Sequence, residues 1–253
     1  EVYVAPDSRF DRELGSGEDR YYHLVLLAEN NQGYSNLMKI VSKGFVDGYY
    51  YKPRVDMEVL EKYSEGIIAL SACLAGEVQK FLLRGMYAEA KEAAKRYENI
   101  FGKDNFYLEM QPSNNQEQII VNKYIIQLSK QTGIPYIITT DSHAATKEDL
   151  YYQARHVQIA HDSETMSETY EGCYLQSEEE IHDIMDNQIG KENVDIGLEN
   201  TNIIADMIEE VNMPFQSPKL PTFPLPEGFN DNYTYLKHLV NEGWVKRGFD
   251  KFS

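Results

Sequence analysis

A carboxylate and an imidazole stand two positions apart directly after an apolar run. Asp141 and His143 follow residues 135–140, Pro-Tyr-Ile-Ile-Thr-Thr, a pattern typical of a buried strand. Side chains two positions apart on an extended chain point to the same side, so both could bind one metal ion. The alternative is that Asp141 caps the next helix and His143 lies in a surface loop. The spacing alone leaves both interpretations open.

Other residues of suitable chemistry border other apolar runs. Cys73 follows one run, Glu109 closes another, and His23 precedes a third. Each type also has an ordinary structural role, and for Glu109 we favour a solvated carboxylate. Cys173 lies among polar residues and is interpreted as structural. Four histidines on helical stretches, without acidic or thiol companions at ligand spacing, are also interpreted as structural: His156, His161, His182 and His238.

The elements that must position these residues alternate between two periodicities. Apolar or β-branched runs predict strands at residues 2–4, 24–28, 67–70, 106–110 and 136–140. Helical patterns predict helices at residues 31–45, 56–63, 78–83, 88–101 and 117–132. Strands alternating with helices of this length predict an α/β fold with a mainly parallel sheet or barrel. In such barrels the carboxyl ends of the strands form the active-site face.

From residue 147 onward the patterns are mostly helical. Thr146 and Ser177 each begin a string that resembles a capping box, and further helices are predicted at 192–209 and 231–248. Residues 162–172 are polar and are expected to form a loop. Five of the nine prolines fall within residues 214–228, which predicts a connector. We therefore expect one domain at 1–213 and the connector with the first helix of a following region at 214–253.

Composition excludes several classes of protein. The 253 residues include 24 Lys and Arg against 41 Asp and Glu, a net charge of −17, which argues against a chain that grips duplex DNA unaided. Only two cysteines occur, which excludes a disulfide scaffold and suits the reducing cytosol. No apolar run approaches about 18 residues, so no membrane span is expected. Walker, Rossmann and nucleophile-elbow motifs are absent from the sequence.

Several strings along the chain resemble those of bacterial DNA polymerase III alpha subunits. They are EVYVAP at 1–6, HLVLLAENNQGY at 23–34, YYKPRVD at 50–56, IALSACLAGE at 68–77, DSH at 141–143, YLQSEEE at 174–180 and LPTFP at 220–224. The resemblance implies the polymerase and histidinol phosphatase (PHP) domain of that family. It implies a distorted βα barrel of TIM-like type whose strand ends hold divalent metals, followed here by a helical extension.

Carried over residue by residue, the resemblance makes five residues metal ligands. They are Glu1, His23, Cys73, Asp141 and His143, of which Asp141 and His143 are also expected to be catalytic. The expected metals are zinc or manganese, with magnesium for the parent polymerase. The family's early His-x-His strand and Thr-Asp-His loop are missing from this sequence. We therefore expect the chain to begin partway into the domain, without about its first two strands.

Two mechanisms follow from the resemblance. The first is a metal-dependent phosphoesterase, with a 3′–5′ proofreading exonuclease as its specific form. The second is a structural module that supports the polymerase and docks the proofreading subunit, and a free-standing PHP phosphatase is a further alternative. The polymerase's own catalytic aspartates are expected downstream of this chain. Through the parent, the expected partners are DNA, the proofreading subunit and the sliding clamp, in the cytoplasm and without a membrane.

Overall fold

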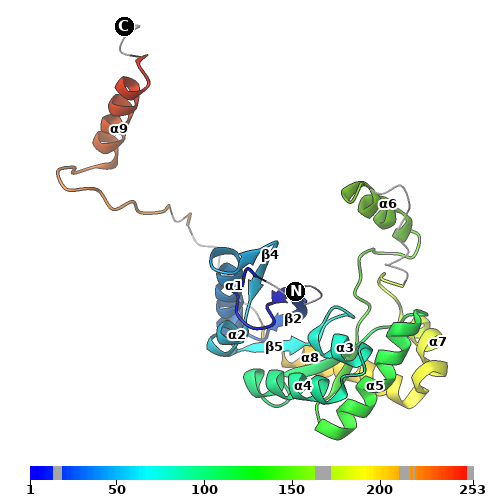
Figure 1. Ribbon diagram of the computed structural model, residues 1–253. Coiled ribbons are helices and arrows are strands. Elements are labelled where there is room, and N and C mark those ends of the chain that lie inside the picture. The colour runs from blue at the N-terminus through cyan, green and yellow to red at the C-terminus, as the bar shows by residue number, and fades with distance from the viewer. Residues whose placement is uncertain (14–18, 163–171, 211–216, 219, 250–253) are drawn as a thin grey trace. The chain divides into compact units, whose positions relative to one another are not determined.

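The computed structural model describes residues 1–13, 19–162, 172–210, 217–218 and 220–249 (Figure 1). The chain divides into two compact units, Glu1–Val211 and Asn212–Ser253. The loop expected at 162–172 lies mostly outside the described residues, and so does the first proline of the expected connector. The described residues of the connector form neither helix nor strand.

The described strands form one open sheet. Its order is β3-β4-β1-β2-β5-β6-β7, and within the described residues the outer strands β3 and β7 do not pair with each other. The strands are β1 (Val2–Val4), β2 (Tyr22–Ala28), β3 (Tyr49–Tyr50), β4 (Lys52–Val55), β5 (Ile67–Leu70), β6 (Phe106–Met110) and β7 (Tyr136–Ile138). The α/β class and all five expected strands are confirmed. The short hairpin β3–β4 was not expected.

The direction of β2 departs from the mainly parallel sheet that the sequence predicted. β5, β6 and β7 are parallel neighbours, and β1 is parallel to β4. β2, however, runs antiparallel to both of its neighbours, β1 and β5, and β3 is antiparallel to β4. The sheet is therefore mixed. A chain that returns from β1 to pair directly with it, without a crossover helix, must reverse its direction.

Where a range was expected, the helices of the described residues agree with it to within two residues at each end. They are α1 (Asn31–Val46), α2 (Met57–Lys62), α3 (Glu77–Leu83), α4 (Tyr87–Phe101), α5 (Gln116–Thr132), α6 (Leu150–Ala160), α7 (Glu178–Ile189), α8 (Lys191–Met207) and α9 (Asn232–Lys246). For α6 and α7 the sequence analysis found only the strings at Thr146 and Ser177. The capping box at Ser177 is confirmed, with Glu180 as its reciprocal partner. None of the described helices combines the length and apolar character needed to cross a membrane.

Alternating side chains give the sheet two apolar faces. Ile67 and Ala69 of β5 belong to the larger buried cluster, which includes side chains from α1 to α5 and α7. Ile68 and Leu70 point the other way and pack in a smaller cluster with Tyr107 and with residues of α8. Both faces of the central strands are thus covered, which explains why these strands are apolar at nearly every position.

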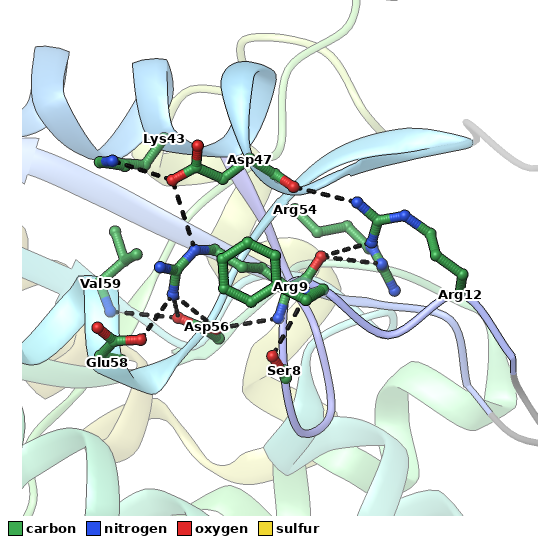
Figure 2. Close-up of polar contacts among 10 residues, drawn as sticks. Ser8, Arg9, Arg12, Lys43, Asp47, Arg54, Asp56, Glu58 and Val59 are labelled. Atoms are coloured by element: carbon green, nitrogen blue, oxygen red, sulfur yellow. Dashed lines mark hydrogen bonds and ion pairs between the residues drawn. The ribbon is translucent and has the colours of Figure 1, made fainter.

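A buried ion pair holds the long connection between β1 and β2 against the sheet (Figure 2). Asp56 caps α2 by accepting a hydrogen bond from the Val59 N–H. The same carboxylate accepts from the backbone N–H of Arg9 at 2.9 Å and from its guanidinium at 2.8 Å. Arg54, which is fully buried, donates to backbone carbonyls of the same connection, among them that of Arg9. These charges satisfy polar groups that burial would otherwise leave unpaired.

Replacing Asp56 with alanine should lower the free energy of unfolding by about 3–5 kcal/mol, because it removes the buried counter-charge of Arg9 and the cap of α2. Arg9 would then keep only the exposed Glu58 and the more distant Asp47 as acidic neighbours among the described residues. Asp56→Asn should lose less, since asparagine still caps a helix. Urea unfolding followed by circular dichroism measures both. Glu58, whose side chain is 74% exposed and also contacts Arg9, is the matched control. Equal losses in Asp56→Ala and Glu58→Ala would contradict a buried ion pair.

Candidate metal centre at the strand ends

His23 lies beside Cys73 because β2 is antiparallel to β5. The pairing of Val25 with Leu70 places the beginning of β2 at the end of β5, where the loop to Cys73 starts. The His23 N–H donates to the Ala75 carbonyl of that loop at 3.1 Å. The Cys73 sulfur lies 3.7 Å from His23 Nδ1. The sequence position of His23, before its apolar run, is therefore compatible with the same sheet edge.

Glu1 completes the first group of ligand-type side chains. Its carboxylate lies 2.6 Å from His23 Nδ1. Figure 1 shows the N-terminus next to β2, with which β1 pairs. Hydrogen bonds to Cys73 and Glu1 raise the pKa of His23 to about 9, and the bond to His23 lowers the pKa of Glu1. At neutral pH His23 therefore carries a proton in the metal-free chain. A metal ion bound by these three residues would take the place of that proton.

A second group forms where the chain leaves β7. One ligand atom from each of Asp141, His143 and Cys173 lies within 4.8 Å of the other two, and the first group meets the same criterion. Burial raises the pKa of Asp141, and the negative charge of Glu1 adds to this effect. Burial, together with the charges of Asp141 and Cys73, raises the pKa of Cys173 to about 11. Charges in one group thus act on the other.

All five residues expected from the resemblance therefore lie in these two groups. Glu1, His23 and Cys73 form one group, and Asp141 and His143 belong to the other. Their role as metal ligands stays a prediction. Cys173, which the sequence led us to interpret as structural, lies beside Asp141 and His143, because the next residue, Tyr174, pairs with Ala144. That pairing joins residues that are 30 positions apart, so no pattern of neighbouring residues in the sequence could predict it.

The backbone is unusual at both groups. Ala72, directly before Cys73, has φ 65°, and Asp141 has φ 44°, a left-handed region that side chains with a Cβ adopt at a cost. Gly76 closes the loop after β5, where an added Cβ would lie 2.1 Å from the Ser71 carbonyl oxygen. Such turns direct the side chains at the strand ends toward the shared edge.

Glu109 is buried beneath the two groups, which corrects the expectation of a solvated carboxylate. Only 4% of it is exposed. Its carboxylate accepts a hydrogen bond from the Ala72 N–H at 3.1 Å and another from the Thr139 hydroxyl. It therefore ties the loop before Cys73 to the segment before Asp141. Burial raises the pKa of Glu109 to about 7.

A small polar network extends from Glu109 into the fold. The Ser71 hydroxyl accepts from the Glu109 N–H at 2.8 Å and from the Gln79 side-chain amide at 2.6 Å. The same Gln79 amide donates to the Ala72 carbonyl at 2.9 Å. The ends of β5, β6 and β7 are thus held together by buried hydrogen bonds, which position the ligand-type side chains without a metal.

The other histidines lie outside these groups, but two of them do have acidic neighbours, His182 and His238, the second of which lies 3.5 Å from Glu242. His182 Nδ1 lies 2.8 Å from the Asp186 carboxylate, one helical turn away, and its Nε2 lies 3.4 Å from Asp195. The expectation that these histidines lack acidic companions is therefore wrong for both. Spacing of four along a helix brings side chains together, and this is the signal that the sequence analysis overlooked. The contact of His182 with Asp195 joins α7 to α8.

The donor set fits a zinc-class metal. Each group offers one carboxylate oxygen, one imidazole nitrogen and one cysteine sulfur, all within 4.8 Å of one another. These are the donor types that zinc binds in proteins, whereas sulfur disfavours magnesium and calcium. A bound cation would also stabilise the ionised form of the acidic side chains and of the thiols, since it attracts the negative charge of each.

Comparison with known proteins shows what the chain is similar to. Residues 1–113 match the PHP domain family. The chain is 38% identical over 252 residues to the DNA polymerase III subunit alpha of Treponema pallidum, covering 98% of this chain and 21% of the relative. It is 35% identical over 265 residues to that of Thermus aquaticus, covering 100% and 21%. The chain thus spans about a fifth of the length of these relatives.

The buried Glu109 should make stability depend on pH. Below about pH 4.5 the folded and unfolded chains both hold its proton, and between about pH 4.5 and 7 only the unfolded chain loses it. The free energy of unfolding of the metal-free chain should therefore fall by about 3 kcal/mol across this range relative to Glu109→Gln, at about 1.4 kcal/mol per unit of pKa.

Urea unfolding of both proteins at a series of pH values measures this difference, since groups common to both cancel. The exposed Glu61→Gln is the matched control for the loss of one carboxylate. A difference between wild type and Glu109→Gln that does not change with pH would show that the folded chain holds Glu109 ionised.

Proposed function

Residues 1–113 of this chain belong to the PHP domain family and the chain is homologous to bacterial DNA polymerase III alpha subunits, and on that premise we propose that it is the metal-binding phosphoesterase part of such a subunit. The observation that carries the proposal is that six ligand-type side chains form two groups of three, one at the loop after β5 and one at the segment after β7. They come from segments up to 172 positions apart in the sequence, from Glu1 to Cys173.

The proposed ligands act with zinc or manganese. Glu1, His23 and Cys73 would hold one ion, and Asp141 and His143 would hold another. A divalent metal supplies Lewis-acid stabilisation of the charge that develops on phosphoryl oxygens and makes a nearby water more acidic. Asp141 and His143 are the two residues that we propose to be catalytic. They would hold the second ion beside the phosphate that reacts.

The role of the rest of the site is to keep this arrangement rigid. Glu109 links the loops of Cys73 and Asp141 by hydrogen bonds to Ala72 and Thr139. Preorganised ligands need not reorganise when charge develops during the reaction. The proposed substrate is a phosphodiester, with the 3′ end of a DNA strand as its specific form, which makes the activity a 3′–5′ exonuclease.

A structural role is the second candidate, and an exposed apolar stripe favours it. Tyr34, Met38, Val41 and Phe45 of α1 are all at least 40% exposed and recur at helical spacing. Such a stripe suits contact with another protein. On this alternative the chain supports the polymerase and docks the proofreading subunit, and it binds metal for stability or binds none.

From the same homology we also propose the activity and the partners of the longer protein. Its activity would be DNA-directed DNA synthesis in chromosome replication, with magnesium at a separate polymerase site. Its partners would be DNA, the proofreading subunit and the sliding clamp, in the cytoplasm. The net charge of −17 implies that this chain itself contributes little to the binding of DNA. The region from 214 onward would lead toward the palm.

Metal content tests the proposal directly. The purified chain, dialysed against zinc or manganese and then against metal-free buffer, should retain metal by elemental analysis. His143→Ala should lower the retained metal by up to about half, because one of the two proposed sites loses a ligand and therefore affinity. His182→Ala is the matched control, since His182 lies outside the two groups. Equal metal in wild type and His143→Ala would contradict the assignment.

Hydrolysis of 3′-terminal nucleotides from a 5′-labelled DNA strand separates the two candidate functions. The chain with manganese or zinc should shorten the strand, and Asp141→Asn should reduce the rate by about 100-fold or more, as expected for loss of a group at the reacting centre. A chelator should abolish the reaction. Full metal content without hydrolysis would favour the structural module over the phosphoesterase.

A further inference from the structure

Cys173 is held against the Asp141–His143 segment by the backbone. Its carbonyl oxygen accepts hydrogen bonds from the His143 N–H at 2.8 Å and from the Ala144 N–H at 3.2 Å. The next residue, Tyr174, forms a parallel bridge with Ala144. The sulfur atom therefore reaches the Asp141 carboxylate and the His143 ring from a fixed position.

The other side of Cys173 is anchored to α7. The Tyr174 side chain is buried, and its hydroxyl donates to Glu180 at 2.7 Å. The Gln176 amide donates to the Gly172 carbonyl at 2.6 Å, and Ser177 begins the capping box of α7. The turn that carries Cys173 thus has its own anchors, so its placement beside Asp141 does not depend on any bound ion.

The side chain of Cys173 does not pack in the apolar core. It is only partly buried and belongs to neither buried cluster of the described residues. It faces a carboxylate and an imidazole, which are poor packing partners for an apolar thiol but natural fellow ligands of a metal. The group repeats the donor set of Glu1, His23 and Cys73, one oxygen, one nitrogen and one sulfur.

We propose that Cys173 is a third ligand in the Asp141–His143 group, so that the site contains two thiolate subsites and each selects a zinc-class ion over magnesium. The inference rests on the proposed function, because it requires that the strand ends bind metal. It adds a ligand that the resemblance does not supply, and it assigns one cysteine to each subsite.

Spectroscopy of metal–thiolate bonds tests this assignment. Cobalt(II) added to the metal-free chain should produce an ultraviolet thiolate-to-metal charge-transfer band. Cys173→Ser and Cys73→Ser should each lose about half of the saturating amplitude, and the double variant should lose all of it, because the two sulfurs are the chain's only thiols. A full band in Cys173→Ser with a lost band in Cys73→Ser would overturn the proposal and leave metal binding intact.

Thiol protection tests the same point in the unmodified chain. Zinc should slow the alkylation of both cysteines by iodoacetamide at least about tenfold, followed peptide by peptide by mass spectrometry, because a bound thiolate is no longer a free nucleophile. Magnesium is the matched control and should protect neither. Protection of Cys73 alone would overturn the role of Cys173, whereas a chain that binds no zinc at all would overturn the proposed function as well.

Discussion

The candidate site depends on the reversed direction of a single strand. Because β2 runs antiparallel to β5, the beginning of β2 lies at the edge where β5, β6 and β7 end. His23 therefore reaches the loop that carries Cys73, and Glu1 reaches His23 from the neighbouring strand. If β2 were parallel to β5, its first residues would lie at the opposite edge of the sheet, a strand length away from Cys73.

Buried hydrogen bonds turn this shared edge into a rigid arrangement. Glu109 joins the end of β5 to the end of β7, and Ser71 with Gln79 joins the end of β5 to that of β6. Burying a carboxylate is unfavourable unless its oxygens are hydrogen-bonded. The burial of Glu109 thus lowers the stability of the fold, but its hydrogen bonds hold the segments of Cys73 and Asp141 in place. A local loss of stability of this kind is typical of functional sites.

Periodicity predicted most of the elements, and it could not predict how they meet. The five apolar runs and the helical stripes were sufficient for the strands and helices, because burial imposes those patterns locally. The β3–β4 hairpin was not predicted because its strands are very short and β4 contains Pro53. Strand direction, the burial of Glu109 and the approach of Cys173 all depend on contacts between distant segments. Only the family resemblance placed His23 in the cluster, since its position before a strand argues against it when all strands are taken as parallel.

The central claim is that two groups of side chains at this edge bind metal. A crystal structure of the chain grown with zinc, with data collected on both sides of the zinc absorption edge, tests it most directly. The account predicts one anomalous peak about 2.3 Å from the Cys73 sulfur, beside Glu1 and His23, and another at the same distance from the Cys173 sulfur, beside Asp141 and His143. Zinc located only on surface residues away from both sulfurs would contradict it.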